Sequence, residues 1–158
     1  MTFRSGAESH EPTPPTPPDL VESGRRTVPD PEDAVVNADT ALMLALDIDG
    51  CMSVALGDHS SGLTLAAVGG VERAALDAAV AAATKTLRST FKVIEEMESV
   101  DLVDDLIINV GPRMHIVCPI PSAGNGPGLF MYAIFDGRVT GLGLARKHLR
   151  AIADGVTL

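Results

Sequence analysis

Two aspartates at the end of an apolar run are the residues in this chain whose type and spacing could do chemistry. Asp47 and Asp49 lie in the sequence LMLALDIDGCM, residues 42–52, and the second of them is followed by glycine. A calcium loop is excluded, because Leu56 and Gly57 stand where such a loop needs its bidentate acidic ligand. The four histidines of the chain have no mutual spacing suited to a metal. We therefore expect no metal site.

The same run resembles the first motif of haloacid-dehalogenase-type phosphatases. That resemblance implies a Mg²⁺-dependent phosphatase in which Asp47 attacks phosphorus and Asp49 acts as the acid. The family has Thr or Val after the glycine, where this chain has Cys51, and an acidic pair after a later strand, whereas Asp104 and Asp105 precede theirs. The chain is also too short for the Rossmann-like core of such enzymes. A phosphatase is therefore the less favoured interpretation, and we expect no catalytic residue and no cofactor.

The composition excludes several classes of partner. The chain has 158 residues, of which 46% are hydrophobic, and this is enough apolar material for one compact domain. Its net charge is -9 and only 3% of its residues are aromatic, so neither a general attraction to nucleic acid nor a base-stacking surface is expected. No apolar run approaches the roughly 20 residues of a membrane span. We expect a soluble, cytoplasmic protein that binds neither nucleic acid nor membrane.

Proline divides the chain into two parts. Residues 1–36 hold seven of the eleven prolines, including the run PTPPTPPD, and they show no apolar periodicity. We expect a disordered tail at 1–36 that serves as a spacer, followed by one globular domain at 37–158. The PxxP spacings of the tail could instead dock into an aromatic groove in polyproline II form.

A long helix is expected over residues 71–97. Its larger apolar residues fall into two rows at spacings of three and four, so one face of the helix should enter the core. These rows contain Leu76, Ala83 and Met97, and Val80, Leu87 and Ile94. The flank away from the core carries small residues first and cations later, namely Ala78, Ala81, Ala82, Lys85, Ser89 and Lys92. Another backbone could approach this flank closely, although alanine also fills exposed positions because it is the best helix former.

Five strands and two further helices complete the predicted order. A short helix should be capped by Asp39 or Thr40, and an amphipathic helix should begin at about Leu142. The expected strands are 51–58, 63–70, 106–111, 114–120 and 128–136. The last of them is apolar except at its ends, so it should be central in the sheet. The order α-β-β-α-β-β-β-α does not alternate as βαβ units would, and it predicts an α+β fold with a mostly antiparallel sheet.

From about Asp39 to Asp154, the chain resembles the roadblock family of dynein-light-chain-type domains, in its small bacterial form. The matching stretches are LDIDGCMSVALGDHSSGLTLAAVGG, the long helix, LIINVGPRMHIVCPI, and GLFMYAIFD leading into LGLARKHLRAI. The resemblance rests on the order and lengths of these elements taken together. It implies a roadblock/profilin-like fold, in which a five-stranded antiparallel sheet carries the long helix across one face. DIDG is then a helix stop and a turn into the first strand.

The resemblance also implies a function without catalysis. Family members form homodimers in which the long helices pair and edge strands join the two sheets, and bacterial ones often bind or activate a small Ras-like GTPase. We therefore expect a regulatory or scaffold homodimer whose interface is the flank defined above, with such a GTPase or another roadblock protein as partner. A small-molecule sensor module of similar architecture is the alternative, although the polar residues Asn109, His115 and Tyr132 show no convergent pattern in the sequence.

Overall fold

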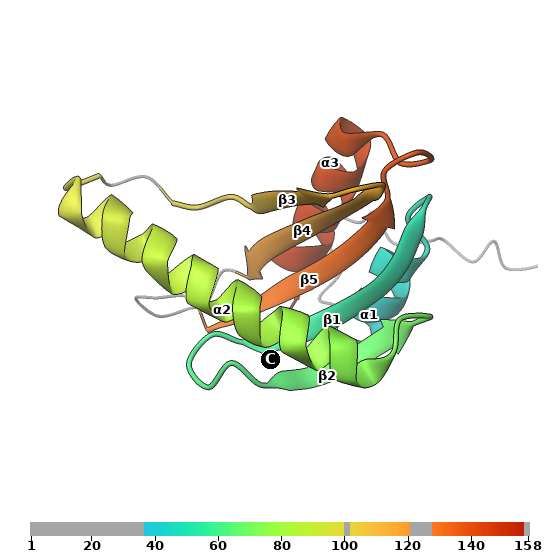
Figure 1. Cartoon of the computed structure of the whole chain (residues 1–158), viewed down its shortest axis with the longest axis horizontal. Coiled ribbons are helices and arrows are strands. Elements are labelled where there is room, and N and C mark those ends of the chain that lie inside the picture. The colour runs from blue at the N-terminus through green and yellow to red at the C-terminus, as the bar shows by residue number, and fades with distance from the viewer. Residues whose placement is uncertain (1–36, 100–101, 121–127, 157–158) are drawn as a thin grey trace, which may run out of the picture.

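A computed structural model of the chain describes residues 37–99, 102–120 and 128–156, so the expected tail lies outside the described part. The elements follow the predicted order (Figure 1). They are α1 (Ala38–Leu46), β1 (Cys51–Asp58), β2 (Thr64–Gly69), α2 (Arg73–Glu96), β3 (Leu106–Val110), β4 (Arg113–Ile120), β5 (Leu129–Asp136) and α3 (Leu142–Asp154). No helix in the described ranges is both long and apolar enough to cross a membrane. The α+β fold class is confirmed.

The five strands form one antiparallel sheet in the order β2-β1-β5-β4-β3. Strand β5 is central, as predicted, and is buried at every position except its last. It lies between strands that are distant in the sequence, so Tyr132 has Ala55 opposite it on β1 and Val117 opposite it on β4. The edges of the sheet are β2 and β3.

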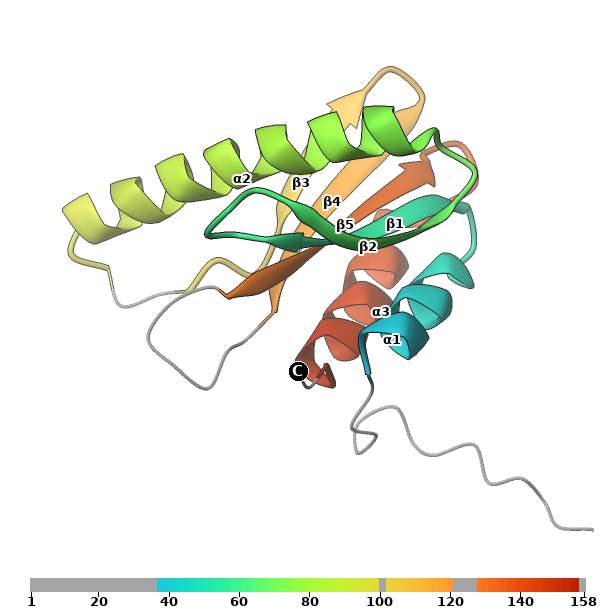
Figure 2. The same ribbon diagram turned by 90° about the horizontal axis from the view of Figure 1, so that it is seen from below.

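Helices α1 and α3 lie side by side on one face of the sheet, and α2 lies alone on the other (Figure 2). Small residues of the helix pair allow close packing against the sheet. The first face buries Ala41, Leu42 and Ala45 of α1 and Ala145, Leu149 and Ala153 of α3 against the strands. Burial of this apolar area on both sides of β5 supplies the main favourable contribution to folding.

Helix α2 packs its first half on the second face and extends past the strands with its last turns (Figure 1). Leu76, Val80, Ala83 and Leu87 are buried there, as the two predicted rows require. The prediction is wrong for Met97, which is 71% exposed, and Ile94 is only partly buried. A helix of 24 residues spans roughly 36 Å at ~1.5 Å per residue. The apolar rows therefore continue beyond the sheet that could bury them.

The turn from α1 into β1 is built by backbone geometry. Helix α1 is capped at Asn37, two residues before the nearer of the two predicted caps, because the Asn37 side chain accepts a hydrogen bond from the Thr40 amide at 2.9 Å. At the other end Asp47 is the C-cap, and Gly50 adopts φ +77°. A Cβ at Gly50 would lie 2.1 Å from Thr140 Oγ1, so this position needs glycine for both conformation and space. DIDG is thus a helix stop and a turn, as expected.

Candidate interaction surfaces

The predicted flank forms one surface on the side of α2 away from the sheet. Five of its six residues are exposed and Ala81 is partly buried. This α2 outer flank consists of Ala78, Ala81, Ala82, Lys85, Ser89 and Lys92. None of its side chains belongs to either buried cluster of the described residues. The alanines are therefore available for a second backbone.

Side chains on one side of α2 contact the hairpin between β1 and β2. The Arg88 guanidinium donates to the carbonyl oxygen of His59 at 2.7 Å and also to that of Ser60. The ring of His59 meets the ring of Phe91 edge-on, with centroids 5.5 Å apart. Burial, and then the charge of Arg88, lowers the pKa of His59. These contacts orient the helix across the sheet.

Strand β3 leaves part of the α2 side of the sheet uncovered. Its register with β4 places Ile108 opposite His115 and Val110 opposite Arg113. Both apolar side chains are exposed, Val110 to 57%. Neither residue is among the predicted interface residues, although an apolar run in an edge strand was a usable signal. Together with Met97, they show that the α2 layer is incomplete in the described chain.

Two of the three polar residues considered for a sensor site meet on this face. His115 Nδ1 lies 2.6 Å from the Tyr132 hydroxyl, and His115 Nε2 is buried with no hydrogen-bond partner among the described residues. Burial, with a smaller effect of the Arg113 charge, lowers the pKa of His115, and burial raises the pKa of Tyr132. Asn109 instead lies opposite Met114 in the sheet, and Met114 packs in the core on the α1 and α3 side. The three residues therefore do not converge.

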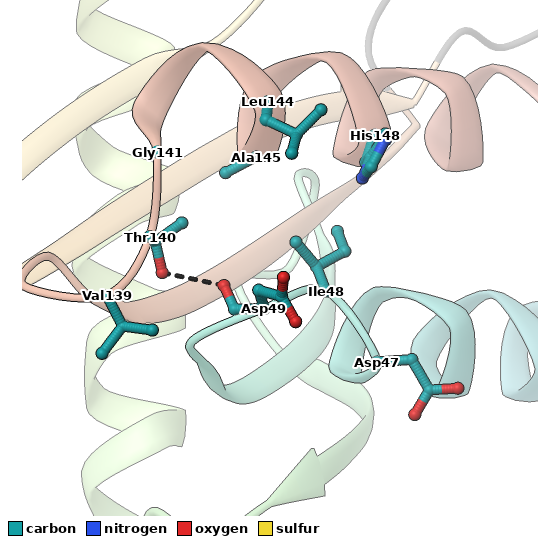
Figure 3. A pocket seen from close by; sticks show the side chains of 9 residues that line it. All are labelled: Asp47, Ile48, Asp49, Val139, Thr140, Gly141, Leu144, Ala145 and His148. Carbon is teal, nitrogen blue, oxygen red and sulfur yellow. Dashed lines mark hydrogen bonds between the residues drawn. The ribbon is translucent and has the colours of Figure 1, made fainter.

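The two candidate phosphatase aspartates lie at a different place, next to a cavity of about 300 Å³ on the α1 and α3 side of the sheet (Figure 3). The cavity is lined by Asp47, Ile48, Asp49, Val139, Thr140, Gly141, Leu144, Ala145 and His148. Both carboxylates are exposed and no cluster of potential metal ligands occurs in the described ranges. Because the sheet is antiparallel, the parallel core that the phosphatase resemblance requires is not the fold of this chain.

Comparison with solved structures finds this fold in roadblock proteins. A Roadblock/LC7 domain from Streptomyces avermitilis has TM-score 0.61 and 13% identity, covering 75% of this chain and 92% of that one. Gliding protein MglB from Thermus thermophilus has TM-score 0.61 and 16% identity, covering 89% and 94%. An MglB with a tetrameric arrangement has TM-score 0.59 and 16% identity, covering 72% and 80%. No family model and no curated protein matches the sequence. At these identities the likeness shows the fold, which is the roadblock fold.

Proposed function

We propose that this protein is a non-catalytic homodimer that regulates or scaffolds a small Ras-like GTPase. The observation that carries the homodimer is the incomplete α2 layer. Met97, the C-cap of α2, and Val110, on the edge strand β3, are exposed apolar side chains beside the core that α2 covers. A second copy related by a two-fold axis would place the same α2 and β3 surfaces against each other. The tetrameric arrangement of one MglB supports self-association in a protein of this fold.

The α2 outer flank supports close helix pairing at the centre of such a dimer. Ala78 and Ala82 are four residues apart on α2 and both are exposed, so two helices could approach there without displacing large side chains. The lysines of the flank lie farther toward the end of the helix than the alanines. If two antiparallel helices cross at the alanines, each lysine lies away from the same lysine of the other copy, so the like charges do not meet. The exposed edge of β3 offers unpaired backbone groups for a strand of the second copy.

The GTPase assignment rests on the resemblance to bacterial roadblock proteins. Such a partner needs a binding surface rather than catalytic residues on this chain. A dimer would present two copies of each outer surface, and it could also form with another roadblock protein in place of the second copy.

Multi-angle light scattering of the full chain tests the homodimer. The wild type should have twice the monomer mass at micromolar concentration, and Ala82→Glu should reduce it to the monomer mass, because the added charge meets its own copy across the two-fold axis. Helical content by circular dichroism should be unchanged, since Glu is a good helix former. Thr40→Glu, which adds the same charge on exposed α1, is the control and should stay dimeric. A monomeric wild type would contradict the proposal.

The regulatory role is tested by single-turnover hydrolysis of GTP. A purified small Ras-like GTPase from the same genome, loaded with GTP, is mixed with the full chain, and phosphate release and complex formation are measured. Complex formation with faster hydrolysis of GTP supports a regulator, and complex formation without faster hydrolysis supports a scaffold. No complex with any such GTPase of that genome would contradict this part of the proposal while leaving the homodimer intact.

A further inference from the structure

We propose that the cavity beside the α1–β1 turn binds an arginine side chain presented by a partner protein. The cavity is lined by the α1–β1 turn, the turn before α3 and α3 itself. Helices α1 and α3 lie on the face of the sheet opposite α2, which carries the proposed dimer surface (Figure 2). The cavity volume of about 300 Å³ is at the lower end of the usual range for ligand pockets. It therefore suits one long side chain better than a cofactor.

The walls of the cavity are held in place by hydrogen bonds between distant segments. Thr140 Oγ1 donates to the carbonyl oxygen of Asp49 at 2.9 Å (Figure 3). The Asp136 amide donates to the carbonyl oxygen of Gly50 at 2.8 Å. The Thr140 amide donates to the carbonyl oxygen of Asp136 at 3.0 Å, which closes the turn before α3. The two turns thus form one unit. A ligand would meet a preformed site and would not need to order it.

The chemistry of the lining fits a cation on an aliphatic stem. Ile48, Leu144 and Ala145 form an apolar wall, and Leu144 is 56% exposed. The Asp49 side chain and the His148 ring lie on either side of Ile48 (Figure 3). An arginine stem packs on apolar surface, while its planar guanidinium can bond a carboxylate and stack on a ring. Lysine offers the stem but neither of the planar contacts.

The two carboxylates beside the cavity have no ion-pair partner in the part of the chain that the structure describes. In the described ranges, five aspartates are in ion pairs with arginine, namely Asp77, Asp104, Asp105, Asp136 and Asp154. Asp58 instead accepts hydrogen bonds from Ser60 and Ser61. No ion pair within the same ranges involves Asp47 or Asp49. With a net charge of -9, the whole chain attracts a cationic partner, and the cavity offers it an apolar contact as well.

The test is an NMR titration of the full ¹⁵N-labelled chain at pH 7.5 with N-acetyl-arginine methylamide. Amide shifts of Thr140, Gly141 and Leu144 should move and saturate, and the shifts caused by the lysine analogue should be weaker. The citrulline analogue, which has the same shape without the charge, should cause no saturable shift at these amides. Equal shifts with citrulline, or shifts spread over the acidic surface without saturation, would overturn the proposal.

Two aspartate variants give a matched control. Asp49→Asn should weaken arginine binding about threefold, which is the size expected for a partly exposed ion pair. Asp39→Asn, at the other end of α1, should leave binding unchanged. Ala82→Glu should also bind as the wild type does, because it changes the opposite face of the sheet, so loss of the dimer and loss of this site are distinguishable. Binding that is unaffected by Asp49→Asn would place the arginine elsewhere and contradict the site.

Discussion

The two faces of the sheet are completed to different degrees. On the first face, α1 and α3 together cover a continuous core that includes Val54, Ile116, Met131 and Phe135. On the second face, α2 alone covers Ala55, Val117, Phe130, Tyr132 and Ile134, and the β3 edge stays exposed. The sheet residues of the first face are therefore covered within the described chain. The second face leaves apolar side chains of β3 exposed, and this is the surface that we propose for association.

The difference between the two faces shows that apolar periodicity in a helix indicates which side chains can be buried. It does not show whether the same chain buries them. Leu87 and Met97 belong to the same predicted helix and the same apolar pattern, yet Leu87 is fully buried and Met97, the C-cap of α2, is exposed. The helix is longer than the sheet beneath it. Residues past the sheet are not buried by the described part of the chain, so their exposure is consistent with the surface that we propose for a partner.

The largest expected effect is a cavity in the first face. Leu149→Ala removes a fully buried side chain of α3 and should lower the free energy of unfolding by about 2–5 kcal/mol. Leu144→Ala makes the same chemical change at an exposed position on the same helix and should change it by less than about 0.5 kcal/mol. Urea unfolding measures both. Similar losses for the two variants would mean that α3 is not packed as described.

A smaller loss is expected when the turn that joins α1 to this face is strained. Gly50→Ala puts a Cβ at φ +77° and against Thr140 Oγ1, and it should lower the free energy of unfolding by about 1–3 kcal/mol. Gly141→Ala is the control, since nothing lies within 4 Å of a Cβ added there and its φ is -75°. Thermal unfolding followed by circular dichroism compares them. A Gly50→Ala protein as stable as Gly141→Ala would show that the turn can relax.

The smallest expected effect is a pH dependence that belongs to the second face. His59 and His115 both have a pKa below the ordinary value of 6.5, chiefly because burial disfavours the charged ring. The unfolded chain then binds more protons than the folded one, so stability is full above pH 6.5 and is lost as pH falls from 6.5 toward the folded-state pKa values. The slope has an upper limit of about 1.4 kcal/mol per pH unit for each histidine, reduced by partial exposure of both rings.

Urea midpoints measured from pH 7.5 to pH 5 test this assignment. His115→Gln should flatten the decline, because it removes one of the two rings whose pKa is lowered by burial. In both histidines the Nε2 atom is buried and has no hydrogen-bond partner among the described residues. Protonation of the ring would leave a charged N–H group there without an acceptor. A decline that stays equally steep in His115→Gln would contradict the assignment to this ring.

The local elements of this protein were determined by its sequence. The spacing of Leu76, Val80 and Leu87 predicts α2 and its buried face, because side chains three and four apart lie on one side of any α-helix. The apolar run of β5 likewise predicts a central strand, since only a strand covered on both faces can bury every position. These patterns repeat within a few residues and need no knowledge of distant partners.

The contacts between segments that are distant in the sequence depend on the tertiary structure. The insertion of β5 between β1 and β4 sets which side chains meet, and no local pattern encodes that order. The strand order places His115 next to Tyr132. It also places the β5–α3 turn beside the α1–β1 turn, so Asp49 and His148 line one cavity although they are far apart in the chain. It also sets where the sheet ends beneath α2, which is why Met97 is exposed. Such contacts depend on long-range strand pairing, whereas periodicity reports only the local backbone.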